Sequence, residues 1–290
     1  MTAPSHEVTR NEAIRFLEDR LQLQRVDKMF ANNKRSLLDA ILCKWHEVIP
    51  FHSLKLLSTD VAERRVPTTK EAVEDISSGL GGLCATHGIA AYHILGALGF
   101  NCYLALSRVI RESFNHVAVL IENVEHPGDL FHFPIGIPYP SFTAVQLRTG
   151  DGSYIYDSGV ISCSSLKCKY VKCGDTYIRY HLTSNGMDKS GRKYPSYVDD
   201  LWGQYYKFWI RRVSENTVQD ILNENVYANI RDAANRTLII SKYPKLEWFG
   251  IWDKLIYAET NGVLKMNAPD SKELKQQIIR HFSGNSSTNR

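Results

Sequence analysis

The feature that most limits the fold of this chain is a change in hydrophobic spacing near residue 100. Apolar residues recur at three- and four-residue spacing in the segments 9–23, 33–49 and 84–100, which indicates amphipathic helices. From Asn101 onward the apolar residues instead form short aromatic and β-branched runs. These runs are separated by Gly, Pro, Asn and Asp and cover 102–110, 115–123, 130–137, 141–149, 153–161 and 176–184. The pattern predicts an α+β protein in which a helical region precedes a sheet or small barrel.

The last third of the chain contains both strand-like and helix-like patterns. Residues 184–196 are rich in Gly, Ser and charge, which is typical of a linker. Strand-like segments follow, and residues 270–282 form an amphipathic pattern that predicts a final helix. We therefore divide the chain into 1–100, 101–195 and 196–290.

Charge and hydropathy exclude several classes of protein. The 35 basic and 31 acidic side chains leave a net charge of +4, too weak a bias to predict nucleic-acid binding. No apolar run reaches the ~18 residues that would cross a bilayer, and the N-terminus lacks a signal-peptide pattern. We expect a cytoplasmic protein without a membrane partner, a monomer or homodimer, whose six cysteines are thiols.

Cys84 is the candidate nucleophile. Gly81 and Gly82 precede it and permit a tight turn, and a helix-compatible run begins at the cysteine itself. The positive end of a helix dipole favours a thiolate, so this position predicts a lowered pKa and fast alkylation. The alternative is a cysteine that only fills space in an apolar helix.

A cysteine that transfers acyl groups needs a base, and three histidines compete for that role. His116 begins the strand-like run 115–123, where a scaffold can hold an imidazole at the edge of a cavity. His87 and His93 lie on the helix that Cys84 starts, where a partner imidazole is not normally found. We therefore predict His116 as the base.

The segment around Cys84 resembles the arylamine N-acetyltransferase family. That family has the pattern Arg-Gly-Gly-x-Cys-x-Glu-x-Asn, a helix ending in Leu-Gly-Phe, a strand with Arg-Val, and a strand opening with the catalytic His. The matching positions are Gly81, Gly82, Cys84, Leu98, Gly99, Phe100, Arg108, Val109 and His116. Upstream, Ile49, Pro50, Phe51 and Leu54 match Ile-Pro-Phe-Glu-Asn-Leu, and the final helix also resembles the family.

The resemblance implies a fold and a reaction. The fold is an N-terminal helical bundle over 1–100, a central β-barrel over 101–195 and a C-terminal α/β lid over 196–290, around a cysteine protease-like triad. The cysteine takes an acyl group from coenzyme A and passes it to an arylamine, hydrazine or related amine. An acyl-coenzyme A is then a co-substrate and a small amine the acceptor.

The departures from the family pattern cluster at the site. Leu80 stands in place of the arginine, Thr86 of the glutamate and Gly88 of the asparagine, and His52 with Ser53 replaces the Glu-Asn pair. This loss of charged and hydrogen-bonding support leaves two alternatives open. One is another biosynthetic, amide-forming enzyme on the same fold, and the other is a catalytically silent member.

Two placements compete for the third triad residue, which orients the imidazole. A gapless match from His116 puts Pro134 at the aspartate's position, whereas Asp157 lies in a better motif match that needs an insertion. Because proline accepts no proton, we prefer Asp157. Residues 124–149 would then form an extra hairpin or flap beside the site. Its aromatics Phe131, Phe133, Tyr139 and Phe142 either line the acceptor pocket or pack in the core.

The sequence gives little evidence for a metal site or for specific coenzyme A contacts. The spacing of Cys163, Cys168 and Cys173 does not match the close pairs of zinc sites, so no metal is expected. No phosphate-binding loop or dinucleotide fingerprint is present, and the sequence does not assign coenzyme A contacts. Arg231 and Arg236 stand near positions where the family has small polar residues.

Overall fold

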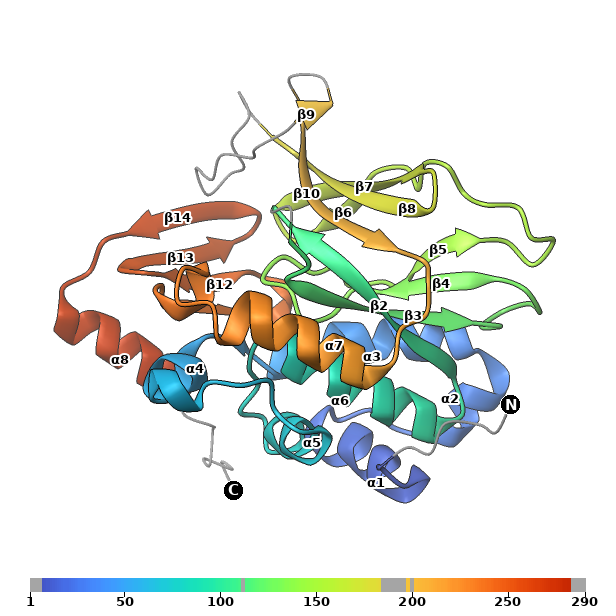
Figure 1. The fold of residues 1–290 in the computed structure, drawn as a ribbon, viewed down its shortest axis with the longest axis horizontal. Coiled ribbons are helices and arrows are strands. Elements are labelled where there is room, and N and C mark those ends of the chain that lie inside the picture. Colours follow the sequence, from blue (N-terminus) through green and yellow to red (C-terminus); the bar gives the residue numbers. More distant parts are fainter. Residues whose placement is uncertain (1–6, 111–112, 184–196, 199–200, 283–290) are drawn as a thin grey trace.

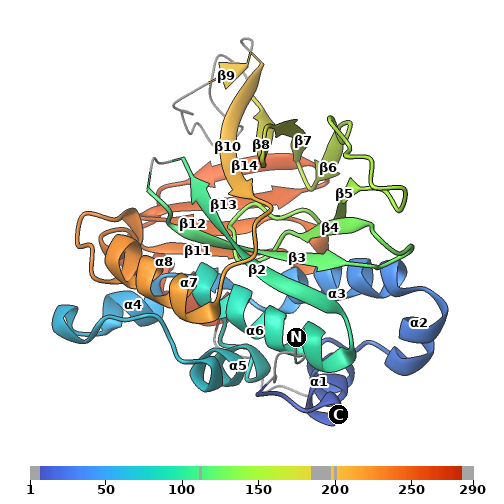
Figure 2. The same cartoon turned by 45° about the vertical axis from the view of Figure 1, so that its right-hand side comes forward.

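A computed structural model describes residues 7–110, 113–183, 197–198 and 201–282. The linker expected at 184–196 lies outside these residues. A layer of helices covers one face of a large curled sheet, and a second sheet lies beside both (Figure 1). The turned view in Figure 2 shows the same helices beneath β2 and β3.

The N-terminal hundred residues are helical, as the spacing predicts. Their α-helices are α1 (Arg10–Arg15), α2 (Val26–Asn32), α3 (Lys34–Val48), α4 (Leu54–Ser58), α5 (Thr69–Ser77) and α6 (Cys84–Leu98), with shorter turns η1 (Phe16–Arg20) and η2 (Val61–Glu63). Thr9 and Thr68 begin α1 and α5 as capping boxes, each side chain accepting from the backbone of the glutamate three residues later. Gly99, with φ of +99°, ends α6.

The curled sheet runs in the order β5-β4-β3-β2-β10-β8-β7-β6. Its strands are β2 (Asn101–Val109), β3 (His116–Glu122), β4 (Leu130–Phe133), β5 (Val145–Arg148), β6 (Ile161–Cys163), β7 (Leu166–Cys173), β8 (Thr176–Leu182) and β10 (Trp202–Trp209), and β9 (Tyr197–Val198) pairs with β10. Residues 154–158 connect its far ends, because Ile155 N donates to Leu147 O and Lys172 N donates to Tyr156 O. The sheet therefore curls back on itself.

The second sheet has the order β1-β11-β12-β13-β14. Its strands are β1 (Phe51–His52), β11 (Ile239–Lys242), β12 (Phe249–Trp252), β13 (Leu255–Thr260) and β14 (Val263–Asn267). The remaining elements are α7 (Glu215–Leu222), η3 (Asn223–Tyr227), η4 (Ala233–Asn235), η5 (Pro244–Leu246) and α8 (Ser271–Phe282), the final helix that the sequence predicts. Leu274 and Ile278 of α8 pack against the core of this sheet.

Two sheet pairings cross the boundaries proposed from the sequence. β10 lies beyond residue 195 but pairs with β2 and β8 in the curled sheet. β1 lies before residue 100 but pairs with β11. The regions of the chain are therefore joined by backbone hydrogen bonds rather than by linkers alone.

Residues 124–149 form a hairpin that belongs to the curled sheet. They supply β4 and β5, which extend the curled sheet from β3. Phe131 and Phe133 are fully buried in the core, and Tyr139 and Phe142 pack in the aromatic cluster of the sheet. The hairpin expected for this segment is thus present, and core packing rather than a pocket wall accounts for all four rings.

Helix α6 packs closely on β3 because residue 88 has no side chain. A Cβ at Gly88 would lie 2.5 Å from Val117 Cγ1, well inside van der Waals contact. Within the described residues, no helix is long and apolar enough to cross a membrane.

Candidate active site

Cys84 and His116 line one cavity of about 240 Å³. Its walls come from the start of α6, the facing ends of β2 and β3, the segment after β4, and the C-terminal third of the chain. They are mostly apolar, and the lining residues are Phe51, Leu83, Cys84, Val109, Ile110, Asn115, His116, Gly136, Ile137, Pro138, Tyr205, Val226, Asp232, Ala233, Ala234, Ile239 and Trp252. The structure thus brings together the predicted nucleophile and the predicted base.

The turn before Cys84 fixes where α6 begins. Gly81 has φ of +79°, and a Cβ there would lie 2.0 Å from Pro50 O, so only glycine fits. Leu83 precedes the helix in an extended conformation, and Cys84 is its first residue. The thiol is 6% exposed and donates to Asn115 O over 3.7 Å, next to the start of β3.

The environment of Cys84 does not stabilise a thiolate. Burial, followed by the negative charge of Asp232, raises the pKa of Cys84 to about 12, although backbone N–H groups act in the opposite direction. The sequence-based expectation of a lowered pKa was therefore wrong. The helix N-terminus is present, but the loss of water around the sulfur outweighs it.

His116 is 3% exposed, and its ring packs edge-on against Tyr206 with centroids 5.2 Å apart. Burial, with a contribution from His87, lowers the pKa of His116 to about 3. The imidazole is therefore neutral at physiological pH, the form that can accept a proton.

Comparisons with known proteins find a similar fold among solved structures but no match to the sequence. No family model matches the sequence, and no curated protein sequence matches it. Among solved structures, the arylamine N-acetyltransferase of M. tuberculosis superposes with a TM-score of 0.72 at 13% identity, covering 94% of each chain. Arylamine N-acetyltransferase C of Bacillus anthracis gives 0.68 at 18% identity, covering 95% of this chain and 99% of that one.

The chain has the arylamine N-acetyltransferase fold. A further match, the Mycobacterium marinum arylamine N-acetyltransferase in complex with CoA, has a TM-score of 0.70 at 14% identity and covers 92% of this chain and 90% of that one. The resemblance of the sequence to a divergent arylamine N-acetyltransferase is thus confirmed in the fold.

Asp157 does not reach this cavity of the arylamine N-acetyltransferase fold. It lies in the segment 154–158 that closes the curled sheet, where it bridges to Val171 of β7. Its side chain is exposed and accepts a hydrogen bond from Gly159 N at 2.9 Å. The motif around Asp157 therefore serves a local turn, and the expectation that it orients His116 is corrected.

The segment that follows β4 lines the cavity instead, at Gly136, Ile137 and Pro138. β4 pairs with β3 so that Phe133 faces Val119, and continuing this register brings Gly136 alongside His116, where both line the cavity. Pro134 has no side-chain acceptor, and its carbonyl bonds with His46 Nε2 at 3.3 Å. In the described part of the chain, the His116 ring has no hydrogen-bond partner to fix its tautomer.

His87 and His93, the competing histidines, have structural contacts. Trp45 Nε1 donates to His87 Nδ1 at 2.9 Å, so His87 Nε2 donates to Pro50 O at 3.1 Å. His93 Nε2 lies 2.7 Å from Glu215 Oε2 of α7. Neither lines the cavity around Cys84.

Two polar residues of the cavity were missed from the sequence. Asn115 holds the ends of β2 and β3 together, because its side chain accepts from Val109 N and donates to Val109 O. Asp232 is buried and caps η4 by accepting from Ala234 N at 2.8 Å. The sequence Asp-Ala-Ala-Asn indicates a helix cap at Asp232. Only the tertiary fold, however, brings Asp232 close to Cys84.

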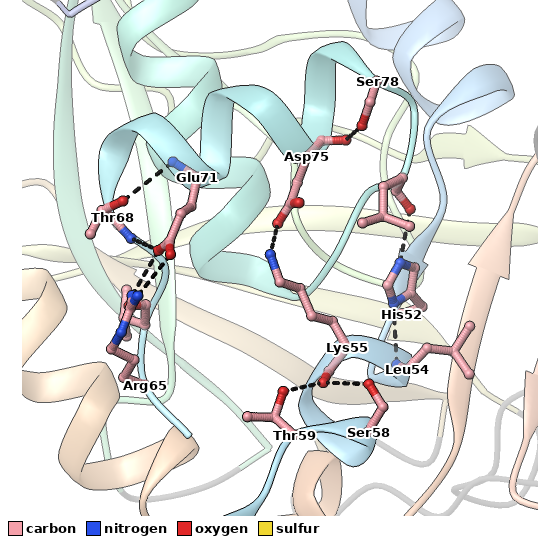
Figure 3. Close-up of polar contacts among 12 residues, drawn as sticks. His52, Leu54, Lys55, Ser58, Thr59, Arg65, Thr68, Glu71, Asp75 and Ser78 are labelled. Carbon is pink, nitrogen blue, oxygen red and sulfur yellow. Dashed lines mark hydrogen bonds and ion pairs between the residues drawn. The ribbon is translucent and has the colours of Figure 1, made fainter. Parts of the chain in front are cut away.

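Two of the residues that depart from the family pattern, His52 and Ser53, bond to backbone groups of neighbouring segments. His52 Nδ1 accepts from Leu54 N, so His52 Nε2 donates to Leu80 O at 2.8 Å (Figure 3). Ser53 Oγ donates to Thr237 O and accepts from Ile239 N. Backbone contacts thus replace the charged supports that the resemblance implies at these positions.

A second cavity, of about 380 Å³, lies on the other side of Leu83, against Gly82 and Thr86. Four of its charged side chains form two ion pairs. Lys55 Nζ contacts Asp75 at 2.5 Å, and Arg65 contacts both carboxylate oxygens of Glu71 at 2.7 Å (Figure 3). Neither Cys84 nor His116 lines this second cavity.

Proposed function

We propose that this protein is an acyltransferase in which Cys84 carries the acyl group and His116 moves the protons. The observation that supports this most directly is the shared cavity of Cys84 and His116 at the start of α6 and β3. The similarity to solved arylamine N-acetyltransferases supports the same reaction class.

In the first half-reaction, Cys84 Sγ attacks the carbonyl carbon of an acyl-coenzyme A thioester. The raised pKa of Cys84 and the lowered pKa of His116 mean that both groups are neutral before the substrate binds. The thiol proton therefore passes to the imidazole as the new S–C bond forms, rather than beforehand. The thiolate of coenzyme A then leaves and takes that proton.

In the second half-reaction, an amine attacks the thioester on Cys84. Neutral His116 accepts the amine proton and returns it to the Cys84 sulfur as the S–C bond breaks. The apolar side chains of the cavity, including Leu83, Val226 and Trp252, favour an acceptor with a flat or aliphatic apolar body.

Arg231 and Arg236 are the candidate residues for binding the acyl-coenzyme A donor. Both are exposed, and they flank Asp232, Ala233 and Ala234 on the cavity wall. Arg236 Nη2 donates to Arg231 O, which holds the two residues close together. Guanidinium groups at the cavity edge suit the phosphates of coenzyme A.

The test is intact-mass spectrometry after incubation with a panel of acyl-coenzyme A thioesters. We expect one acyl group per chain, located on Cys84 by peptide mapping and released when an arylamine or hydrazine is added. Cys84→Ala should carry no acyl group, whereas Cys43→Ala, on half-buried Cys43 of α3, should be acylated like the wild type.

The proline at position 134 and the raised pKa of Cys84 favour one alternative, a silent relative that binds ligands without turnover. The same experiment separates the two proposals. If no thioester acylates Cys84 while acyl-coenzyme A binding is still detected by calorimetry, the silent alternative replaces the enzymatic one.

A further inference from the structure

Two buried cysteines lie close together in the β6–β7 hairpin, away from the Cys84 cavity. Cys163 Sγ and Cys168 Sγ are 3.5 Å apart, and the residues are 3% and 0% exposed. The hairpin pairs Cys163 with Leu166 and Ile161 with Cys168, so both cysteines project from the same face of the sheet.

The neighbouring strand β8 places Arg179 beside this pair. Arg179 is fully buried, and its Nη2 lies 4.0 Å from Cys163 Sγ and donates to Pro140 O at 3.3 Å. In the part of the chain that the structure describes, no carboxylate lies within ion-pair distance of Arg179, and its Nε and Nη1 have no hydrogen-bond partner. A buried guanidinium needs a counter-charge, and the two sulfurs are the acidic groups at hand.

The pKa shifts of Cys163, Cys168 and Arg179 are consistent with this arrangement. The hydrogen bond from Cys163, with the charge of Arg179, lowers the pKa of Cys168 against the opposing effect of burial. The pKa of Cys163 is raised, chiefly because it donates that hydrogen bond. Burial disfavours the charge of Arg179, but Cys168 and Tyr170 raise its pKa. The directions of these shifts favour a thiolate on Cys168 over one on Cys163, next to a cation.

We propose that Cys163 and Cys168 form a redox-active dithiol that a hydroperoxide converts to a disulfide. This site is separate from the acyl-transfer proposal and does not depend on it. Because both sulfurs are buried, the oxidant must be small enough to enter the core beside the hairpin. From the protein, a reactive cysteine pair requires a nucleophilic sulfur, a second sulfur within reach and a cation that stabilises the first. The hairpin and Arg179 supply all three.

The reaction has two steps. Cys168 Sγ attacks the terminal peroxide oxygen, the O–O bond breaks, and the departing alkoxide or hydroxide is protonated to an alcohol or water, leaving a sulfenic acid on Cys168. Cys163 Sγ then attacks that sulfur, the S–O bond breaks, and hydroxide leaves with the Cys163 proton as water. The two thiols lose two electrons, which reduce the hydroperoxide. The sulfurs must move from 3.5 Å to the ~2.05 Å of a disulfide bond.

The test treats the wild-type protein with a small excess of hydrogen peroxide at pH 7, followed by denaturation, alkylation and trypsin digestion. Lys167 lies between the two cysteines, so trypsin puts them on separate peptides that remain joined only by a disulfide. We expect this linked pair to appear while Cys84 and Cys43 are still alkylated. If Cys163 and Cys168 are alkylated as fully as Cys43, the proposal is overturned.

Matched variants locate the chemistry. Cys173→Ser, at an exposed position on β7, should leave the rate unchanged. Cys163→Ser should stop at a Cys168 sulfenic acid that dimedone traps, and the absence of this sulfenic acid would contradict the proposed order.

Arg179→Met should slow oxidation at pH 7 at least tenfold. Where that variant does not fold, the wild-type pH profile decides: a rate that is flat from pH 7 to 9 supports a preformed thiolate, and a tenfold rise per pH unit opposes it.

Discussion

Cys84 is subject to two opposing influences, a helix N-terminus and nearly complete burial. The first is visible in the sequence as two glycines before a helical run, and it led us to expect a thiolate. The second depends on side chains from distant segments such as Val226 and Ile239. Because desolvation acts on the whole charge, it determines the direction of the pKa shift here.

Alkylation of Cys84 should therefore be slow at neutral pH. With a pKa raised to about 12, the thiolate fraction and the rate should increase about tenfold per pH unit between pH 7 and 9. Iodoacetamide labelling followed by peptide mass spectrometry measures this, with exposed Cys173 as the internal comparison. Labelling of Cys84 that is faster than that of Cys173 at pH 7 would contradict the prediction.

Asp232 contributes to this shift and can be tested alone. Asp232→Asn removes the negative charge but keeps the oxygen that accepts from Ala234 N. The thiolate of Cys84 is then less disfavoured, so its pKa falls and labelling at pH 8 should be several-fold faster. Asp175→Asn, at an exposed position in the β7–β8 turn, is the control that should not change the rate.

At the scale of elements, the contact between α6 and β3 positions Cys84 relative to His116. Val117 follows His116 directly and faces Gly88, one turn into the helix that Cys84 begins. Any side chain at position 88 would push these elements apart. The departure from the family's asparagine thus makes the approach of helix and strand possible.

Gly88→Ala should destabilise the protein by about 1–3 kcal/mol, because the added methyl group overlaps Val117 Cγ1. Urea unfolding measures the loss. In the double variant Gly88→Ala with Val117→Ala, the total loss should be smaller than the sum of the two single losses. Strict additivity would show that the two positions do not interact.

Much of the element order could be predicted from local patterns. The helices α1, α3 and α6 and the strands β2, β3 and β8 follow their apolar periodicity. The third position of the site could not be predicted in this way. Asp157 has the better local motif, but that motif is satisfied by Gly159 N. Only the pairing of β4 with β3 shows that the segment after Pro134 reaches the cavity. Strand register across the sheet is a long-range property.

For the whole molecule, buried neutral histidines predict a marked loss of stability in mild acid. Burial is the main cause that lowers the pKa values of His46, His87 and His116 to about 3 in the native state. An imidazole in the unfolded chain titrates near ~6.5, so below that pH the unfolded state binds protons that the native state excludes. Their contribution is complete above about pH 6.5 and is lost as the pH falls toward 3.

Each such group changes the unfolding free energy by at most about 1.4 kcal/mol per pH unit. Thermal unfolding at pH 7.5, 6.5, 5.5 and 5.0 should therefore show a small decrease in the midpoint between the first two values and a steep fall at the last two. His46→Gln should reduce the slope, and His126→Asn, at an exposed position, should not. An unchanged midpoint down to pH 5.0 would refute the prediction.

The pairing of β1 with β11 has a consequence for how the protein is made. Ser53 Oγ bonds with Thr237 O across 184 residues, and β11 supplies Ile239 to the Cys84 cavity. During synthesis on a ribosome, Cys84 and His116 emerge long before this wall exists. The newly made chain therefore exposes its thiol to water until the C-terminal third docks, and loss of alkylation at Cys84 would report the completion of folding.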